Sequence, residues 1–360
     1  MGALADPAPD PAPDPQARAQ DLTDAAIGGD RRALARLLTA VENRTPVAEA
    51  ALRSLYPMAG KAHLVGITGA PGSGKSTLAA ALIAEVRSLG RTVGVIAVDP
   101  SSPITGGALL GDRVRMQSYA SDGDVFIRSM ASRGHAGGLA ATSAAAAAVL
   151  DAAGFDLVLL ETVGTGQSEV EVAAAADTTV VLEAPEMGDE VQAIKAGLLE
   201  VADIVVVNKG DRPGAQRTAS QLRAMLVAVS RVGSADDAHH GGSLPDAGAA
   251  GDVQEAGLPA ARPRPKQPEV LVTTATTGEG IKELLAALDR HRAAGNEGPG
   301  ATARLARARA QVWAILSDRL TTDLAGPDNR AETDAVLQAV ADHELDPFAA
   351  ADRLLNRIRG

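Results

Sequence analysis

The stretch GITGAPGSGKSTLAAALIAE, residues 66 to 85, restricts the possible folds of this chain more than any other part of it. It contains the pattern G-x-x-x-x-G-K-[ST], which ends in Lys75 and Ser76. In such a loop, backbone N–H groups and the N-terminus of the following helix bind phosphate oxygens. The lysine reaches the β- and γ-phosphates, and the serine hydroxyl binds Mg²⁺. An apolar run at 64–68 precedes the loop and an Ala/Leu-rich helical segment follows it, which is the context the pattern requires.

We therefore predict a nucleotide-phosphate site in this loop. The residues that we expect to contact the phosphates are Gly69, Ala70, Pro71, Gly72, Ser73, Gly74, Lys75, Ser76 and Thr77.

Apolar runs alternate with helical segments along most of the chain. Runs such as TVGVIAVD, FDLVLLE and DIVVVNK are almost continuously apolar, as strands of a parallel sheet are when helices cover both of its faces. We predict an α/β fold, with a doubly wound, mostly parallel sheet in a P-loop domain at 61–293. Helical periodicity predicts an N-terminal helical extension at 18–60 and a C-terminal helical arm at 294–360. Biased composition predicts a disordered tail at 1–17 and a low-complexity insertion at 233–268.

The composition excludes several classes of function. The 360 residues carry a net charge of −11, which argues against broad nucleic-acid binding, because that needs clustered Lys and Arg. The chain has no Cys, so disulfides and thiolate metal sites are excluded. We find neither an apolar run long enough for a membrane span nor a secretory signal pattern, and we expect a cytoplasmic protein.

Three carboxylates are candidates for a Mg²⁺ environment, which usually includes a carboxylate near the C-terminal end of a neighbouring strand. Asp99 ends the run TVGVIAVD, Asp112 lies in PITGGALLGDRVRM, and Glu161 ends FDLVLLE just before the Gly-rich TVGTGQSE. Each could instead be a helix cap or a loop charge. We predict that Ser76, Asp99, Asp112 and Glu161 form the metal environment.

The run VVVNKGD predicts which base the site binds. Its N-K-x-D pattern at a strand end is typical of guanine recognition. The carboxylate of Asp211 can accept hydrogen bonds from N1–H and N2–H₂ of guanine, a donor pair that adenine lacks. We expect Asn208 to bridge the base and the loop, and the stem of Lys209 to lie along the ring. A weaker signal, TTATTGEG, predicts backbone contacts to the base from Thr274, Ala275 and Thr276.

Several segments together resemble one family. They are GITGAPGSGKSTL, VIAVDPSSPITGGALLGDRVRM, FIRSMASRGHAGGLA, ETVGTGQSEVEVA, GDEVQAIKAGLLEVADIVVVNKGD and TTATTGEGI. The chain is similar in these segments to the methylmalonyl-CoA mutase-associated GTPases, the MeaB/ArgK group. The likeness covers about 20–230 and 269–355. Departures include Gly210 in place of the usual alanine, the insertion at 233–268, and Glu183 with Ala184 where small polar residues and proline are typical.

The resemblance implies a GTP-hydrolysing, Mg²⁺-dependent chaperone. Such a protein gates adenosylcobalamin loading into a cobalamin-dependent acyl-CoA mutase and protects that mutase. The resemblance also implies a homodimer formed through the C-terminal arm, and GTP and GDP as the bound nucleotides. Lys75, Glu161 and Lys195 would be the catalytic residues, with Lys195 at the end of a loop that signals the nucleotide state.

Three rival interpretations stay open. A nickel-loading GTPase would need Cys or clustered His for its metal. A small-molecule or protein kinase of the ArgK type would need an acceptor pocket and a base. A binding scaffold without chemistry is disfavoured by the intact Lys75, Ser76 and Glu161.

Overall fold

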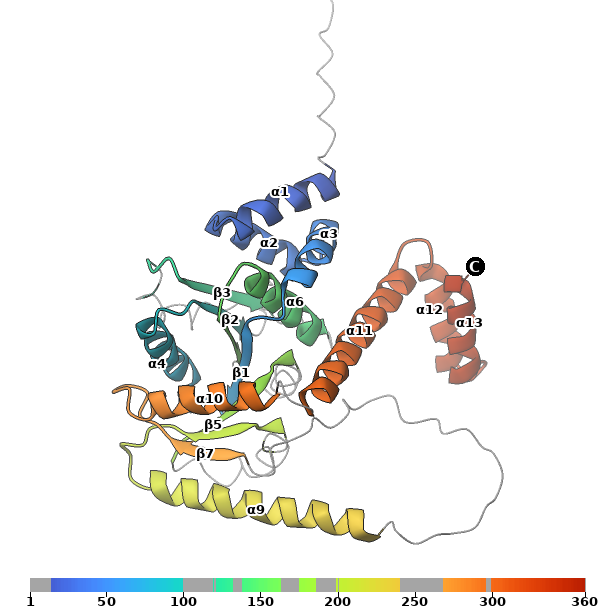
Figure 1. Ribbon diagram of the computed structural model, residues 1–360. Coiled ribbons are helices and arrows are strands. Elements are labelled where there is room, and N and C mark those ends of the chain that lie inside the picture. The colour runs from blue at the N-terminus through green and yellow to red at the C-terminus, as the bar shows by residue number, and fades with distance from the viewer. Residues whose placement is uncertain are drawn as a thin grey trace, which may run out of the picture.

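The computed structural model describes residues 14–99, 119, 121–131, 138–162, 175–185, 199, 201–239, 268–295 and 299–359. Within these ranges, seven strands form one sheet in the order β3-β2-β4-β1-β5-β6-β7 (Figure 1). The strands are β1 (His63–Gly69), β2 (Val93–Asp99), β3 (Val125–Ala131), β4 (Leu157–Thr162), β5 (Thr178–Glu183), β6 (Ile204–Val207) and β7 (Glu269–Val272). Every pair of neighbouring strands is parallel. The predicted doubly wound, parallel α/β fold is therefore confirmed.

Strand β3 is the one strand of this sheet that the sequence patterns do not predict. Its sequence, VFIRSMA, has Arg128 and Ser129 in the middle, which interrupt the apolar run. The strand lies at the edge of the sheet, so its central residues are only half-buried. An edge strand needs less apolar character than a central one, and the pattern is correspondingly weaker.

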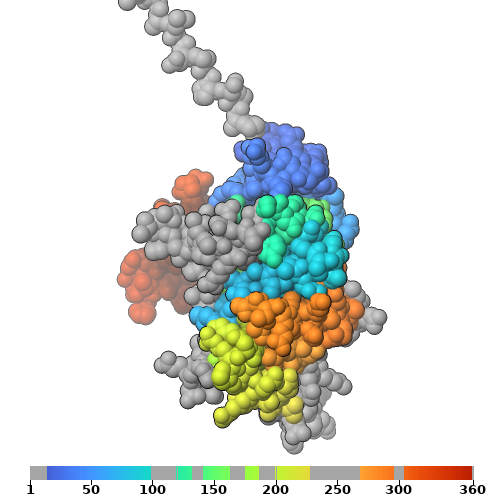
Figure 2. Space-filling model, turned by 90° about the vertical axis from the view of Figure 1, so that its left-hand side faces the viewer, coloured from blue at the N-terminus to red at the C-terminus, as the bar shows by residue number. Residues whose placement is uncertain are grey.

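Helices cover both faces of the sheet. On one face, α4 (Lys75–Ser88) and α10 (Ile281–Gly295) pack on residues of β1, β2, β4, β5 and β6. Figure 2 shows these two helices side by side, in cyan and orange, below the blue N-terminal helices. On the other face, α6 (Gly138–Ala152) packs on β2 and β4, and α9 (Ala215–His239) packs on β5, β6 and β7.

The N-terminal extension consists of α1 (Pro15–Ile27), α2 (Arg31–Glu42), α3 (Pro46–Leu55) and the short 3-10 helix η1 (Tyr56–Met58). It packs on α6 and β3, and its buried leucines join the same core. Helix α1 begins at Pro15 because the Asp14 side chain accepts a hydrogen bond from the backbone N–H of Gln16. Proline suits the first helical turn, since its missing N–H would be unpaired there anyway. The predicted tail at 1–17 is thus too long by three residues.

Helix α9 overlaps the start of the low-complexity insertion that we predicted at 233–268. It continues to His239, so residues 233–239 of the predicted low-complexity insertion are helical. The sequence SADDAHH contains no proline or glycine after Gly233, and nothing in it ends a helix that is already formed. Residues 240–267 of the insertion lie outside the described residues.

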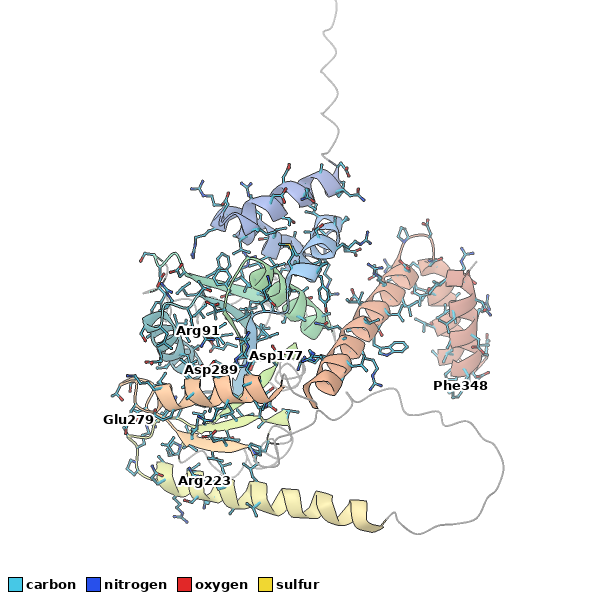
Figure 3. The ribbon with its side chains drawn as sticks, viewed as in Figure 1. Arg91, Asp177, Arg223, Glu279, Asp289 and Phe348 are labelled. Carbon is cyan, nitrogen blue, oxygen red and sulfur yellow. The ribbon has the colours of Figure 1, made fainter. Side chains whose placement is uncertain are left out.

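The C-terminal arm consists of α11 (Pro299–Ala325), α12 (Arg330–Ala341) and α13 (Pro347–Arg359). Near the start of α11, Arg307 Nη2 donates to Asp177 Oδ1 at 2.6 Å, just before β5. Further along, Arg319 Nη2 donates to Glu49 Oε2 of α3 at 2.8 Å. The arm then turns away from the body, and Figure 3 labels Phe348 on α13 at a distance from the sheet. None of the helices in the described ranges is long and apolar enough to cross a bilayer.

Candidate functional site

The Gly-rich loop joins β1 to α4 at the carboxyl edge of the sheet. Strand β1 ends at Gly69, and α4 begins at Lys75 after Gly74, which adopts a left-handed conformation with φ of 98°. A side chain at either glycine would collide with its neighbours. A Cβ at Gly69 would lie 2.1 Å from Leu182 O, and one at Gly74 would lie 2.4 Å from Asn208 Nδ2. The loop can follow this path only because it has glycine at these two positions.

Lys75 is held inside this loop. Its Nζ donates to Gly69 O at 2.7 Å and to Ala70 O at 3.2 Å, and only 7% of the residue is exposed. The loop is tightened further by a backbone hydrogen bond of 3.1 Å from Ser73 N to Ala70 O. The ammonium group therefore lies at the concave side of the loop beside the N-terminus of α4. This combination of a fixed positive charge and a helix N-terminus favours binding of anions such as phosphate.

Ser76 and Glu161 meet between α4 and the end of β4. The Ser76 hydroxyl donates to Glu161 Oε1 at 2.6 Å, and both residues are buried. The pair forms because Glu161 lies opposite Ile67 in the register of β4 with β1, close to the start of the loop. The next residue, Thr162, donates to the Thr68 hydroxyl at 3.3 Å. A hydroxyl and a carboxylate beside a phosphate-binding loop are oxygen ligands of the kind that Mg²⁺ prefers, so these residues fit that ion.

The remaining predicted metal and catalytic residues are described only in part. Asp99 is the last residue of β2, two strands from β1, and its side chain lies outside the described residues. Asp112 and Lys195 also lie outside them. Among the side chains that are described, no group of three or more His, Cys, Asp or Glu could hold a metal ion.

Asn208 connects three loops at this edge of the sheet. It follows β6, is buried, and donates from Nδ2 to Ser73 O in the Gly-rich loop at 3.0 Å. Its Oδ1 accepts from Ala275 N and from the Thr273 hydroxyl, each at 3.2 Å, in the loop after β7. The amide thus uses both its donor and its acceptor sides. Two segments that are 135 residues apart in the chain are joined by this one side chain.

The residues after Asn208 continue toward the Gly-rich loop. Lys209 has a positive φ of 58°, which is uncommon for a residue with a side chain, and its Nζ donates to Gly72 O at 2.6 Å. Gly210 N donates to Thr273 O at 2.9 Å, and a Cβ at this glycine would lie 2.9 Å from Val272 Cγ1. Asp211 follows with an exposed side chain. The N-K-x-D segment therefore lies beside the Gly-rich loop, with its carboxylate open to solvent.

The loop after β7 completes the arrangement. Thr274 N donates to Glu279 O at 2.9 Å, and the Thr274 hydroxyl approaches Glu279 Oε2 at 3.4 Å. Ala275 is buried in the apolar cluster that α4 and α10 form with the sheet, whereas Thr276 is exposed. Thr273 and Glu279 were not among the predicted site residues. The run TTATTGEG, which contains both residues, could have predicted them. Its last glycine, Gly280, adopts a left-handed φ of 76°, which indicates a tight turn at this position.

The structure thus brings together the predicted residues of the Gly-rich loop, Glu161, the N-K-x-D segment and the loop at 274–276. They meet along the carboxyl ends of β1, β4, β6 and β7. Ligands of open α/β sheets bind at this edge. The geometry can hold a phosphate chain at the Gly-rich loop, with a base beside Asp211.

Comparisons with known proteins agree with this geometry. Residues 34–328 match the family model described as methylmalonyl Co-A mutase-associated GTPase MeaB. A Pyrococcus abyssi protein that carries a GTPase name is 43% identical over 92% of this chain and 94% of its own length. GTPase ArgK of Escherichia coli is 45% identical over 51% of this chain and 56% of its own length. The methylmalonic aciduria type A homolog of Caenorhabditis elegans, a mitochondrial protein, is 38% identical over 53% of this chain and 52% of its own length. A crystal structure of a LAO/AO transport system kinase superposes with a TM-score of 0.61 and 25% identity, over 96% of this chain and 98% of that one.

Proposed function

Because the chain belongs to the family of methylmalonyl-CoA mutase-associated GTPases, we propose that this GTPase serves an adenosylcobalamin-dependent acyl-CoA mutase as a chaperone. In this role it gates cofactor loading and protects the mutase from inactivation. The name of the matching family and that of the Caenorhabditis elegans relative support this proposal. The observation that carries its nucleotide-binding part is the contact of Asn208 with both the Gly-rich loop and the loop after β7, which supports one guanine-nucleotide site made from distant parts of the chain.

The residues have distinct roles in this proposal. The loop from Gly69 to Thr77 binds the phosphates, and Lys75 stabilises the negative charge that develops on the γ-phosphate oxygens during hydrolysis. Asp211 accepts hydrogen bonds from guanine, while the backbone at 274–276 lies along the base edge. Asn208 and Lys209 position the base segment against the phosphate loop, since each donates to a carbonyl of that loop.

Ser76 and Glu161 would hold Mg²⁺, with Asp99 and Asp112 as the further acidic residues of its environment. When bound, the ion neutralises charge on the β- and γ-phosphates. The chain's own contribution is to keep the Ser76 hydroxyl and the Glu161 carboxylate buried at a fixed position, where water does not compete for them. Lys195 would report the nucleotide state to the partner.

We also propose that the protein is a homodimer formed through its C-terminal arm. Large apolar side chains of α11 are exposed, with exposed fractions of 71% for Leu305, 63% for Val312 and 42% for Leu316. Their spacing places these three residues on one side of the helix. Phe348 of α13 is 85% exposed. Exposed apolar side chains that gather on one side of a helix mark an interaction site.

The decisive experiment measures GTP hydrolysis by the full-length protein alone and with purified cobalamin-dependent acyl-CoA mutases. We expect slow hydrolysis by the protein alone and stimulation by its cognate mutase. Lys75→Ala should lower both rates by at least about a hundredfold, because the developing charge loses its partner. Lys61→Ala changes a lysine outside the site and is the matched control, which should leave both rates unchanged.

Two outcomes separate the parts of this proposal. Hydrolysis that no mutase stimulates would contradict the chaperone role and leave the GTPase activity intact. Transfer of the γ-phosphate to an amino acid or a protein, in place of release as inorganic phosphate, would favour the kinase interpretation that the name of the similar crystal structure suggests.

A further inference from the structure

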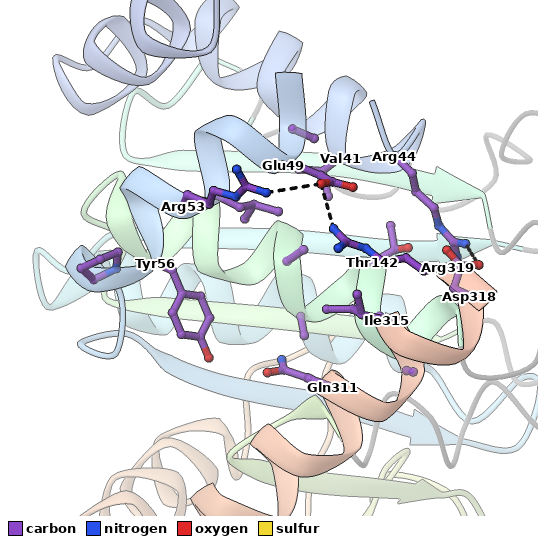
Figure 4. Close-up of a pocket in the computed structure, with 17 residues that line it drawn as sticks. Val41, Arg44, Glu49, Arg53, Tyr56, Thr142, Gln311, Ile315, Asp318 and Arg319 are labelled. Atoms are coloured by element: carbon purple, nitrogen blue, oxygen red, sulfur yellow. Dashed lines mark hydrogen bonds and ion pairs between the residues drawn. The ribbon is translucent and has the colours of Figure 1, made fainter. Parts of the chain in front are cut away.

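A cavity lies between the N-terminal helices, α6 and α11, away from the nucleotide site (Figure 4). Its volume is about 570 Å³, which is within the usual range for small-molecule sites. Four alanines of two helices line this space with side chains too short to fill it: Ala141, Ala144 and Ala145 of α6 and Ala314 of α11. The cavity exists because α6 and α11 present short side chains here, so that the space between them and α3 is not filled.

The walls of the cavity are mainly apolar. Val41, Ala48 and Leu52 line it from α2 and α3, and Ile315 lines it from α11. Ile315 is 47% exposed, so a large aliphatic side chain faces this open space. Burying such surface is favourable, so an apolar ligand would bind here.

The charged groups that line the cavity lie at its partly exposed rim. Two ion pairs join α11 to the N-terminal helices there: Arg319 with Glu49 at 2.8 Å, and Arg44 with Asp318. Figure 4 shows Tyr56 and Gln311 at the side of the cavity away from these ion pairs. Apolar walls with a few polar groups at the mouth are typical of sites for amphipathic small molecules.

The rim favours a negatively charged ligand. It contains three arginines, Arg44, Arg53 and Arg319, against the two carboxylates of Glu49 and Asp318. Arg53 is the most exposed of the three and its only ion pair in the described residues is a 4.0 Å contact with Glu49. This local excess of positive charge occurs on a chain whose net charge is −11. Arg53 is therefore available to bind an anionic group.

The volume argues against a protein segment as the occupant. A helix about 10 Å across would fill the cavity with little more than one turn, which is too short a contact for specific docking. A single alkyl chain occupies less than this volume, and the side chains of Val41, Leu52 and Ile315 would give it apolar contacts.

We propose that this cavity binds a small amphiphile with one straight alkyl chain and one anionic head group. The chain lies against the alanines of α6 and against Ile315, and the head group lies at Arg53. Because the ligand would fill the space between α11 and α3, it also stabilises the position of the C-terminal arm. The cavity shares no lining residue with the Gly-rich loop or the N-K-x-D segment. Ligand binding in the cavity and GTP hydrolysis can therefore be tested separately.

The test is isothermal titration calorimetry of the full-length protein with fatty acids of increasing length, from octanoate to tetradecanoate, below their micellar concentrations. We expect one ligand per chain. The affinity should rise about fourfold for each added methylene across this series, because even tetradecanoate is smaller than the cavity. Decanoate should bind at least about fivefold more tightly than decyltrimethylammonium, which has the same alkyl chain and the opposite charge.

Two variants with matched controls locate the binding. Filling the cavity with the double variant Ala141→Leu and Ala145→Leu should weaken decanoate binding at least about tenfold. Ala224→Leu on the exposed side of α9 should not change it. Arg53→Gln should remove the preference for decanoate over the cation, whereas Arg217→Gln on α9 should preserve that preference.

Three results would overturn the proposal. The first is binding that does not saturate, and the second is an affinity that does not rise with chain length. The third is unchanged binding by the filled variant, which would place the ligand on the exposed face of α11 instead. Circular dichroism and thermal unfolding would verify that each variant is folded, and decanoate should raise the Tm of the wild type but not that of the filled variant.

Discussion

At the scale of single residues, Asn208 has the most consequences. Its side chain is the one described connection that touches both the phosphate loop and the loop after β7. Since a buried amide left with unpaired groups is costly, the three contacts hold one another in place. This mutual dependence explains how a base-binding segment and a phosphate-binding segment keep a fixed separation.

Asp211 gives a direct test of base recognition. In Asp211→Asn, the side chain keeps one acceptor and gains a donor, so it can no longer accept both hydrogen bonds from guanine. We expect the affinity for GTP to fall at least about a hundredfold, and that for xanthosine triphosphate to rise, because xanthine has an acceptor at its 2-position. Fluorescence titration with labelled nucleotides measures both. Asp342→Asn, an exposed change in the C-terminal arm, is the control, and equal losses for both nucleotides would contradict the assignment.

His63 is the second residue with a testable consequence. It begins β1 at the amino edge of the sheet, far from the nucleotide loop, and its Nε2 lies 2.7 Å from the Thr178 hydroxyl. That hydroxyl lies 2.8 Å from His291 Nδ1, and His291 Nε2 lies 3.5 Å from Asp203. Burial, reinforced by the positive charge of Arg292, lowers the pKa of His63 to about 3.

This pKa makes the stability of the fold depend on pH. In the unfolded chain a histidine takes up a proton near pH 6.5, whereas folded His63 stays neutral down to about pH 3. The unfolded state thus binds more protons, and stability is complete above pH 6.5 and falls as the pH decreases toward 3. Between pH 8 and pH 5 we expect His63 to account for a loss of about 2 kcal/mol.

The comparison of His63→Gln with wild type measures this loss. The glutamine amide can still donate to Thr178 but has no proton to gain. Urea unfolding at several pH values should show a weaker pH dependence for this variant. His343→Gln, at an exposed position, should behave like wild type. Parallel pH profiles for all three proteins would show that His63 titrates normally.

At the scale of elements, helix α2 stabilises the edge strand β3. Arg31 donates from Nη1 to Gly123 O at 2.7 Å and from Nη2 to Val125 O at 2.6 Å, and its guanidinium lies 5.4 Å from the centre of the Phe126 ring. At the other end of the strand, Glu42 accepts from Ala131 N at 3.1 Å. The N-terminal extension therefore covers the exposed edge of the sheet and fixes both ends of its last strand.

Removing the first of these contacts should be costly. Arg31→Met keeps the aliphatic stem but removes every hydrogen bond to the strand, and we expect a loss of about 2 kcal/mol in the free energy of unfolding. In this variant, hydrogen exchange should become faster in β3, whereas exchange in the central strands should change less. The neighbouring exposed residue provides the control, Arg32→Met, for which we expect a loss of less than about 0.5 kcal/mol.

At the scale of the whole molecule, the C-terminal arm extends from the body with its apolar side chains exposed. The arm is anchored where Arg307 meets Asp177 and where Arg319 meets Glu49. Large apolar side chains of α11 and α13 remain exposed beyond these contacts, among them Val312 and Phe348. In the part of the chain that the structure describes, no other element covers them. A second copy of the chain would bury this surface.

The proposed dimer predicts that a charge on the exposed face of α11 separates the two copies. Val312→Asp would place an unpaired carboxylate in the interface, and we expect a monomer at concentrations where the wild type is a dimer. Light scattering after size-exclusion chromatography measures the mass of each. Met225→Asp alters an exposed apolar residue of α9 and should leave the dimer intact. A monomeric wild type at high concentration would contradict the proposal.

The sequence by itself predicted the parallel α/β fold and the segments that meet at the candidate site, although not Thr273 and Glu279. Both depend on local patterns: apolar runs of strand length, a glycine-rich turn before a helix, and N-K-x-D after a strand. Each of these patterns needs only neighbouring residues to be recognised, as the Gly-rich loop before Lys75 shows. The patterns are weaker where a strand lies at an edge, and so β3, with Arg128 in its middle, was not predicted.

Only the tertiary structure decided which of these residues meet. The hydrogen bonds of Asn208 to two distant loops, the contact of Ser76 with Glu161, and the cavity between α3 and α11 join segments that are far apart in the chain. Such contacts depend on the order of the strands and on the packing of helices, which a local pattern does not contain. The sequence therefore specified the chemistry of the nucleotide site, whereas the packing of whole elements specified its geometry and created the cavity beside the arm.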